Sequence, residues 1–206
     1  MKKIYAITMI AIFMASCKAP QKTETMKVKN ETVATIMNRR SIRAYLPEQI
    51  KPEQLDTIMQ CAINAPSAMN KQSWEVRVIR KPELIKAINE GYMAYAKVKD
   101  SEKAGFSVFH GAPTVIIVAS NVTNDYSPVD CGLLGQNILL SAESMNIGTC
   151  VIGSVIGYLN APEAKDLVAQ LNLPANYKPL YAVSIGYKNE RPEAKPRDNA
   201  KVQVIK

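Results

Sequence analysis

The chain contains the stretch Thr114-Val115-Ile116-Ile117-Val118-Ala119, a run of aliphatic residues without a charge. Such a run predicts a strand that is buried on both faces of a sheet. The next long segment, Asp130–Met145, carries apolar residues on nearly every helical face. This pattern predicts a helix buried in a core or in a subunit interface, and we favour the interface.

Helices and strands alternate around these two segments. Residues 52–64 form an amphipathic pattern in which apolar side chains recur three and four positions apart, and Pro66 requires the helix to end before it. Further strands are expected at 74–80, 151–155 and 180–187, and further helices at 84–88, 92–103 and 162–172. The pattern predicts an α+β domain built around one sheet.

The composition is that of one globular domain. The chain has 206 residues, of which 47% are hydrophobic and 21% charged, so it can bury a sizeable core. Its 26 Lys and Arg against 18 Asp and Glu give a net charge of +8, which suits nucleic acid, anionic lipid or a phosphorylated ligand. A single histidine, His110, argues against a His-rich metal site, and no metal ligands are predicted.

The N-terminus has the pattern of an export signal. Three residues, Met1-Lys2-Lys3, form a basic start, and Ile4–Met14 is an apolar run too short to span a bilayer. Its end, Ala15-Ser16-Cys17, resembles the lipobox of bacterial lipoproteins; a non-lipidated signal and an uncleaved anchor are the alternatives. We therefore expect a signal peptide at 1–16, lipid attachment at Cys17, a flexible tether at 17–30 and a folded domain at 31–206, tethered to the bacterial cell envelope outside the cytoplasm.

The three remaining cysteines, Cys61, Cys131 and Cys150, each lie in an apolar stretch. We expect them to be buried thiols, with a disulfide or a reactive thiol as the alternative.

Three separate segments are candidates for a binding site. The cluster Arg39-Arg40-Ser41-Ile42-Arg43 presents guanidinium groups suited to phosphate, although a solvated basic surface has the same composition. The stretch from Pro66 to Gln72 contains small and amide-bearing residues, as a simple turn does. The third segment, Lys195-Pro196-Arg197, adds two cations that would also fit a basic tail.

Taken together, these segments resemble the nitroreductase family of FMN-dependent oxidoreductases over residues 32–199. The matching motifs are Arg39–Arg43, Ala65–Trp74, Asp130–Met145 with Gly148–Gly153, Ile185–Tyr187 and Lys195–Arg197. One departure is Ser73, which stands where the family has proline, and we expect it to loosen the turn that places Gln72.

The resemblance implies a nitroreductase-like fold, with a mostly antiparallel central sheet flanked by helices, and a homodimer with an extensive interface. It also implies bound FMN, whose ring would carry the chemistry without a catalytic side chain. The phosphate and ribityl chain would be held by Arg39, Ser41, Arg43, Lys195 and Arg197, and the ring or ribityl hydroxyls by Arg40. The partner's flavin would be reached by Pro66, Ser67 and Asn70, and Ala68, Met69 and Gln72 of the same stretch would also bind the cofactor. Ile152 and Gly153 would lie beside the flavin ring.

In the family the segment 91–111 forms part of the pocket over the flavin. It carries Tyr92, Tyr95, Phe106 and Phe109, which would stack on a flat acceptor or pack in the core. For His110 we expect a surface or hydrogen-bonded residue rather than a proton donor.

The resemblance therefore implies an oxidoreductase that reduces nitroaromatic, quinone or similar flat acceptors in two half-reactions, with NAD(P)H as donor. An exported protein meets little free nicotinamide, so either the donor differs or the signal is misread. The alternatives are a flavin-binding envelope lipoprotein without turnover, and another flavin activity such as dehalogenation. Nucleic-acid binding ranks last, because the basic residues cluster at two positions rather than along a stripe with aromatics.

Overall fold

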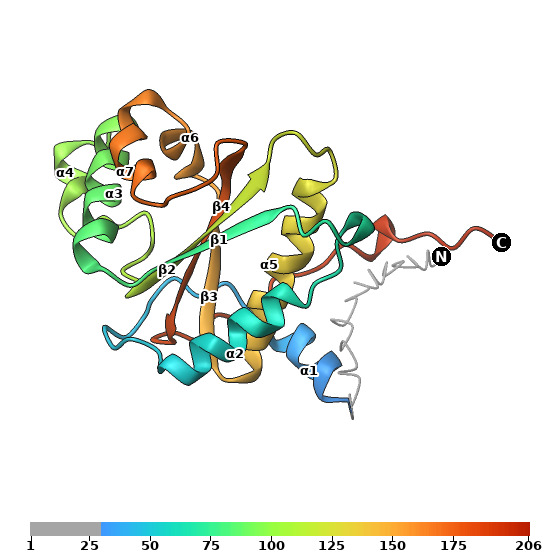
Figure 1. Ribbon diagram of the computed structural model, residues 1–206. Helices are drawn as coiled ribbons and strands as arrows, with labels where there is room; N and C mark the ends of the chain where they lie inside the picture. The colour runs from blue at the N-terminus through green and yellow to red at the C-terminus, as the bar shows by residue number, and fades with distance from the viewer. Residues whose placement is uncertain (1–29) are drawn as a thin grey trace, which may run out of the picture.

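One antiparallel sheet organises the molecule, in the strand order β1-β2-β4-β3 (Figure 1). The computed structural model describes residues 30–206, so the predicted signal peptide, Cys17 and nearly all of the tether lie outside the described residues. The strands are β1 (Trp74–Ile79), β2 (Thr114–Asn121), β3 (Ile147–Ile152) and β4 (Tyr177–Tyr187). In β2 the residues Val115 to Ala119 have no exposed surface, which confirms the strand predicted to be buried on both faces.

The strand predicted at 151–155 is wrong in its position. The observed β3 runs from Ile147 to Ile152, pairing residue by residue with β4 until Ile152 lies opposite Ala182. The chain then turns at Gly153 and enters helix α6 (Ile156–Leu159). The sequence pattern missed the start of the strand because Gly148 and Thr149 interrupt the run of apolar residues. In the structure both residues are buried in the sheet.

Two helices cover one face of the sheet, α2 (Pro52–Ile63) and α5 (Ser127–Ser144) (Figure 1). Helix α2 confirms the prediction for 52–64, and both helices carry proline in the first turn, where its missing N–H costs nothing. One side of α5 packs into the core through Cys131, Leu134 and Ile138, while its Val129 and Leu133 are 62% and 42% exposed. The core alternative thus holds for the side of α5 that faces the sheet, and an interface on its other side stays a prediction.

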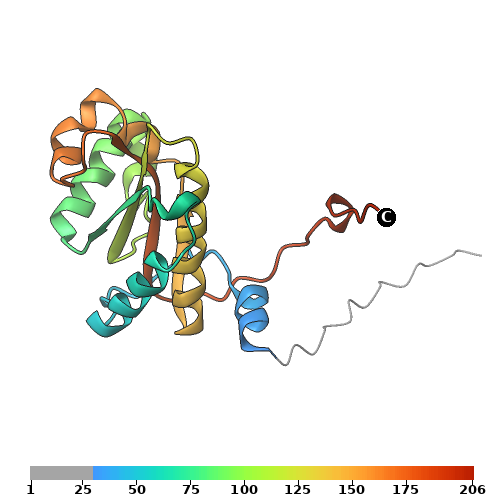
Figure 2. The ribbon, with the colours of Figure 1, turned by 45° about the vertical axis from the view of Figure 1, so that its right-hand side comes forward.

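The opposite face is covered by a second group of helices (Figure 2). These are α3 (Pro82–Tyr95), α4 (Asp100–Lys103), α6, the 3-10 turn η2 (Pro162–Ala164) and α7 (Lys165–Ala169). The helices predicted at 84–88 and 92–103 are thus one long helix, α3, followed by a short one. The helix predicted at 162–172 ends at Ala169, and Asn172 beyond it has a left-handed backbone with φ of 47°.

Both ends of the described chain lie away from the sheet (Figures 1 and 2). Helix α1 (Glu31–Asn38) buries no residue, and its Val33, Ile36 and Met37 are exposed. After β4 the chain continues as an arm, which contains the short turn η3 (Asn199–Lys201). Near its end, Val202, Val204 and Ile205 are at least 78% exposed.

None of the helices in residues 30–206 combines the length and the hydrophobicity needed to cross a bilayer.

The contact between α3 and α6 gives a test of the packing. A Cβ atom added to Gly91 in α3 would overlap the hydroxyl of Tyr158, whose side chain is buried. We expect Gly91→Ala to lower the free energy of unfolding by roughly 1–3 kcal/mol despite the better helix propensity of alanine. The control is Gly157→Ala, whose Cβ meets its nearest atom, the Tyr95 hydroxyl, at 3.5 Å. Urea denaturation that showed equal stability for both variants would contradict this packing.

Candidate functional site

The first candidate segment, Arg39–Arg43, lies between β3 and the chain that follows β4. The main-chain N–H of Ile42 donates to the Thr149 carbonyl at 2.9 Å, and Asn189 N–H donates to the Ala44 carbonyl at 3.0 Å. The Ile42 side chain is buried against Gly148, where a Cβ would approach it to 3.0 Å. Glycine at position 148 therefore allows this segment to lie close against β3, which fixes where the flanking polar side chains emerge.

Within this segment the cations take different positions. The Arg40 guanidinium donates to the Met37 and Arg39 carbonyls at 2.7 and 2.8 Å, so it caps the C-terminus of α1. Arg43, by contrast, is exposed and lines a cavity. The structure thus places Arg43, rather than Arg40, beside the residues predicted to contact a flavin ring.

That cavity has a volume of about 360 Å³ and brings together the end of β3 and the predicted pocket segment. The turn after β3 contributes Ile152 and Gly153, and open space surrounds the Cα of Gly153 where a Cβ would stand. Another part of the lining is aromatic, because Tyr92 and Phe106 stack with ring centroids 6.2 Å apart and planes 13° apart. The cavity offers flat, partly apolar walls and one cation, a combination that suits a planar ligand.

The aromatic residues of segment 91–111 divide between the core and the cavity. Phe109 is fully buried in the core, and Tyr95 packs on Tyr158 with ring centroids 5.7 Å apart. Tyr92, Phe106 and His110 line the cavity. Phe109 thus packs in the core, Tyr95 is 45% exposed, and stacking of the cavity aromatics on a flat acceptor stays a prediction.

His110 occupies a specific place in this cavity. Its backbone is left-handed, with φ of 57°, and its N–H donates to the Ser107 carbonyl at 3.0 Å. Burial lowers the pKa of the imidazole below its ordinary value, Arg43 lowers it further, and Glu190 raises it. The side chain is therefore neutral at neutral pH.

Cys150 is also in the cavity wall and is 3% exposed. Burial raises the pKa of its thiol, and this outweighs the opposing effects of Arg43 and Ser41. A protonated thiol is a poor nucleophile, so the cavity holds no activated cysteine.

The second candidate segment, Pro66–Gln72, forms a turn held by two side-chain oxygens. Ala68 N–H donates to Asp130 Oδ1 and Gln72 N–H donates to Ser67 Oγ, both at 3.0 Å. Met69, Asn70 and Gln72 have left-handed backbones, with φ of 54°, 52° and 48°. The buried Asp130 was noted in the sequence only as the start of a helix; its charge in an apolar segment was the signal for such a role.

Ser73, the departure from the family pattern, is hydrogen-bonded in this region. Its side chain is 3% exposed, and its hydroxyl accepts a hydrogen bond from the Asn124 amide. Its carbonyl accepts a hydrogen bond from the Ser127 hydroxyl. Of these two contacts only the one with Asn124 uses the serine side chain, and a looser turn than with proline stays a prediction.

The two candidate segments lie at opposite ends of the sheet. Trp74, which follows the second segment, pairs with Ser120 at the end of β2. Ser41 pairs with Thr149, which is in register through Ile185 with Thr114 at the start of β2. Six residues of antiparallel strand span about 20 Å. A single chain therefore does not bring the two segments to one ligand.

The third candidate segment, Lys195–Arg197, is exposed on the C-terminal arm. Arg197 Nη1 donates to the carbonyl of Lys195 at 3.2 Å. The arm starts beside the first segment, because Tyr45 pairs with Lys188 and the Arg43 N–H donates to the Glu190 carboxylate. The structure thus brings the start of this arm, but neither of its two predicted cations, into contact with Arg39–Arg43. Glu190 itself was missed, because no sequence pattern distinguishes it from other surface carboxylates.

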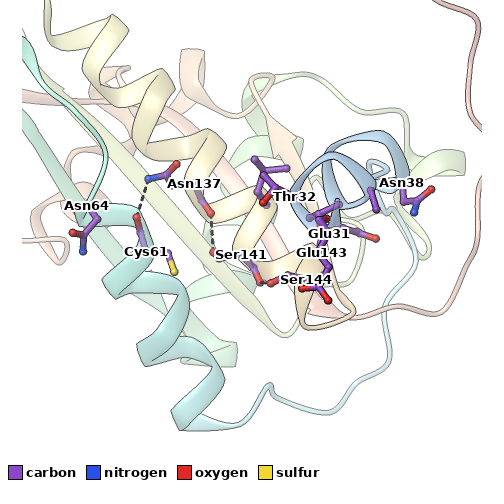
Figure 3. Close-up of a pocket in the computed structure, with 12 residues that line it drawn as sticks. Glu31, Thr32, Asn38, Cys61, Asn64, Asn137, Ser141, Glu143 and Ser144 are labelled. Carbon is purple, nitrogen blue, oxygen red and sulfur yellow. Dashed lines mark hydrogen bonds between the residues drawn. The ribbon is translucent and has the colours of Figure 1, made fainter. Parts of the chain in front are cut away.

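A larger cavity of about 860 Å³ lies between α1, α2 and α5 (Figure 3). It contains none of the predicted site residues. Cys61 lines it and is exposed, which corrects the prediction of a buried thiol, whereas Cys131 and Cys150 are buried as predicted. All three thiols are free. In the described part of the chain, no three His, Cys, Asp or Glu residues group as metal ligands do.

Comparisons with known proteins agree with this arrangement. The model of the nitroreductase family matches residues 36–187. An NADPH-flavin oxidoreductase of Vibrio harveyi is 32% identical over 187 residues, covering 85% of this chain and 73% of the relative. An FMN reductase [NAD(P)H] of Bacillus subtilis is 28% identical over 188 residues, covering 82% and 70%. The structure of a nitroreductase with bound FMN from Desulfitobacterium hafniense superposes with a TM-score of 0.79 at 29% identity, covering 87% of this chain and all of that one.

The single histidine allows a direct test of the cavity's electrostatics. We expect NMR titration of the only imidazole in the chain to give a pKa below the ordinary value of 6.5. Arg43→Gln should raise this pKa, because it removes a positive charge that opposes protonation. As a control, Arg40→Gln should leave it unchanged, since Arg40 caps α1. An equal response to the two variants would refute the placement of Arg43 beside His110.

Proposed function

This chain belongs to the nitroreductase family, and from that premise we propose that it is an FMN-dependent oxidoreductase that reduces flat acceptors such as nitroaromatics or quinones, with NAD(P)H as donor. The observation that carries the proposal is the cavity in which Arg43, the turn at Ile152–Gly153 and the aromatic pair Tyr92–Phe106 meet. The FMN named for the superposed structure and the activities named for the two relatives support it.

The residues of the cavity fit such a cofactor. Open space beside Gly153 lets a planar ring approach the main chain, which a side chain would prevent. Ile152, which is buried, gives this wall an apolar surface. Arg39, Ser41 and Arg43 emerge from one anchored segment and can bind an anionic tail. Lys195 and Arg197 lie on the arm without contacting this segment, so their part in the site stays a prediction.

When bound, FMN supplies the redox chemistry by taking a hydride from the donor and passing electrons to the acceptor. The chain's own residues bind and orient the cofactor and the substrates. Arg43 places positive charge at the cavity, which favours electron-rich groups there. His110 and Cys150 are neutral at neutral pH and give the cavity no charge of their own. The stacked pair Tyr92–Phe106 offers a flat acceptor an aromatic surface.

We also propose that the protein works as a homodimer. The segment Pro66–Gln72 lies about 20 Å along the sheet from Arg39–Arg43, so it serves a flavin bound by a second copy. The exposed apolar residues of α1, of α5 and of the arm are surfaces that a second copy would cover, as Val129 and Ile205 illustrate with exposures of 62% and 88%.

Finally, we propose that the protein is a lipoprotein of the cell envelope, anchored through Cys17. The support is the sequence alone, namely the basic start, the short apolar run and Ala15-Ser16-Cys17. Membership of the family does not determine which electron donor the protein would use in the envelope.

The proposed activity has a direct spectroscopic test. Purified residues 18–206 should show flavin absorption bands, which bleach when NADH or NADPH is added without oxygen. Bands that persist with both donors would favour a different donor or a flavin carrier. A colourless protein that takes up no added FMN would overturn the proposed function.

The shared site predicts complementation between damaged subunits. One variant would combine Arg39→Ala with Arg43→Ala, the other Ser67→Ala with Asn70→Ala, and each alone should bind FMN poorly. After subunit exchange, half of the dimers are mixed and contain one intact site, so about one quarter of the wild-type FMN sites should return. Unmixed samples treated in the same way are the control, and no recovery in the mixture would place the whole site within one chain.

Membrane attachment is tested by substitution of the proposed lipid acceptor. The full-length protein should sediment with membranes and be released by detergent. Cys17→Ser should move it to another fraction or leave it unprocessed, because the acyl chains that anchor it are missing. Cys61→Ser removes a thiol elsewhere and should change nothing. Retention of palmitate label by the Cys17 variant would contradict the proposal.

A further inference from the structure

Glu190 holds the segment that carries Arg43. Its carboxylate accepts a hydrogen bond from the main-chain N–H of Arg43, across 147 positions of sequence. The contact continues the pairing in which Tyr45 lies opposite Lys188 and Asn189 N–H donates to the Ala44 carbonyl. Glu190 is half-buried, so its charge is only partly screened by water.

The carboxylate binds the main chain of Arg43 rather than its side chain. Among the ion pairs of the described residues, none joins the Arg43 guanidinium to Glu190. Arg43 lines the cavity, the carboxylate accepts from its main-chain N–H, and its Nη1 lies 3.5 Å from the Ser41 carbonyl.

Neighbouring groups respond to both charges. The pKa values of His110, Cys150 and Tyr45 are each shifted one way by Arg43 and the opposite way by Glu190. His110 and Cys150 line the cavity, so a ligand inside it lies beside groups that respond to both charges, although Glu190 itself lines a neighbouring hollow with Lys188 and Arg191. The adjacent cation Lys188 does not neutralise Glu190, because both oxygens of Glu143 bind it at 2.9 Å.

We propose that Glu190 is a positioning residue that holds the Arg43 main chain at the cavity and offsets the Arg43 charge, so that the bound flavin is a stronger reductant than Arg43 alone would make it. This inference rests on the proposed function. Reduced flavin is the electron-rich form, so positive charge stabilises it and a nearby carboxylate destabilises it. Glu190 thus lowers the affinity for reduced FMN more than that for oxidised FMN.

Two substitutions separate the charge from the hydrogen bond. Glu190→Gln keeps a carbonyl oxygen that can accept the Arg43 N–H but removes the charge. Glu190→Ala removes both, so it should also weaken the binding of oxidised FMN. The matched control is Glu193→Gln, which removes the same charge from an exposed position on the same arm.

The experiment measures FMN affinity and midpoint potential for the full chain in detergent. For Glu190→Gln we expect the ratio of reduced to oxidised FMN affinity to rise about tenfold, which is about 30 mV for a two-electron couple. The affinity for oxidised FMN should change by less than about threefold, since one screened charge is lost while the hydrogen bond remains. In the apoprotein, the same variant should lower the pKa of His110 further, because Glu190 raises it.

The outcomes distinguish this inference from the function on which it rests. An unchanged potential in Glu190→Gln, with wild-type protein that binds FMN, would overturn the inference and leave the function intact. An equal shift in Glu193→Gln would also overturn it, because the effect would then be one of net charge. A wild-type chain that binds no FMN would overturn both.

Discussion

The main-chain hydrogen bonds that hold residues 41–45 between β3 and the start of the C-terminal arm are the contacts on which the candidate site depends. Ile42 bonds to Thr149 on one side, and Ala44 to Asn189 on the other. These bonds join residues 41–45 to two parts of the chain that each lie more than a hundred residues further on. They bring Arg43 into one cavity lining with Gly153, and they place the Glu190 carboxylate at the Arg43 main-chain N–H. Without them, the basic cluster would be an ordinary solvated patch.

The length of the sheet imposes the second constraint. The turn that carries Ser67 and Asn70 is held by Asp130 in the first turn of α5. Measured along the strands of the sheet, this turn lies about 20 Å from the segment of Arg43. Three of its residues have left-handed backbones, and none of its residues lines the cavity beside β3. In the proposed dimer, a second copy of the chain would contact this turn and the exposed apolar residues on α1 and on the arm. The proposed flavin site is therefore complete only in the proposed dimer.

The chemistry of the cavity follows from its charges. Burial leaves the Cys150 thiol protonated and the His110 imidazole neutral, so neither is poised as an acid or a nucleophile at neutral pH. What remains in the lining is the Arg43 cation, the aromatic pair Tyr92–Phe106 and hydroxyl groups, with the Glu190 carboxylate at the main-chain N–H of Arg43. Such a cavity can bind a redox cofactor, whose own chemistry needs no activated side chain.

The sequence by itself determined the strand at 114–119, the helices at 52–64 and 130–145, and the motifs that assign the family, because these depend on local periodicity and residue type. Only the tertiary structure decided where β3 begins, since Gly148 and Thr149 become strand through pairing with β4 rather than through their own preference. It also decided that Arg40 caps α1 while Arg43 lines the cavity, and that Cys61 is exposed. Glu190 shows the limit most clearly: its role comes from a contact across 147 positions, and no local pattern encodes such a contact.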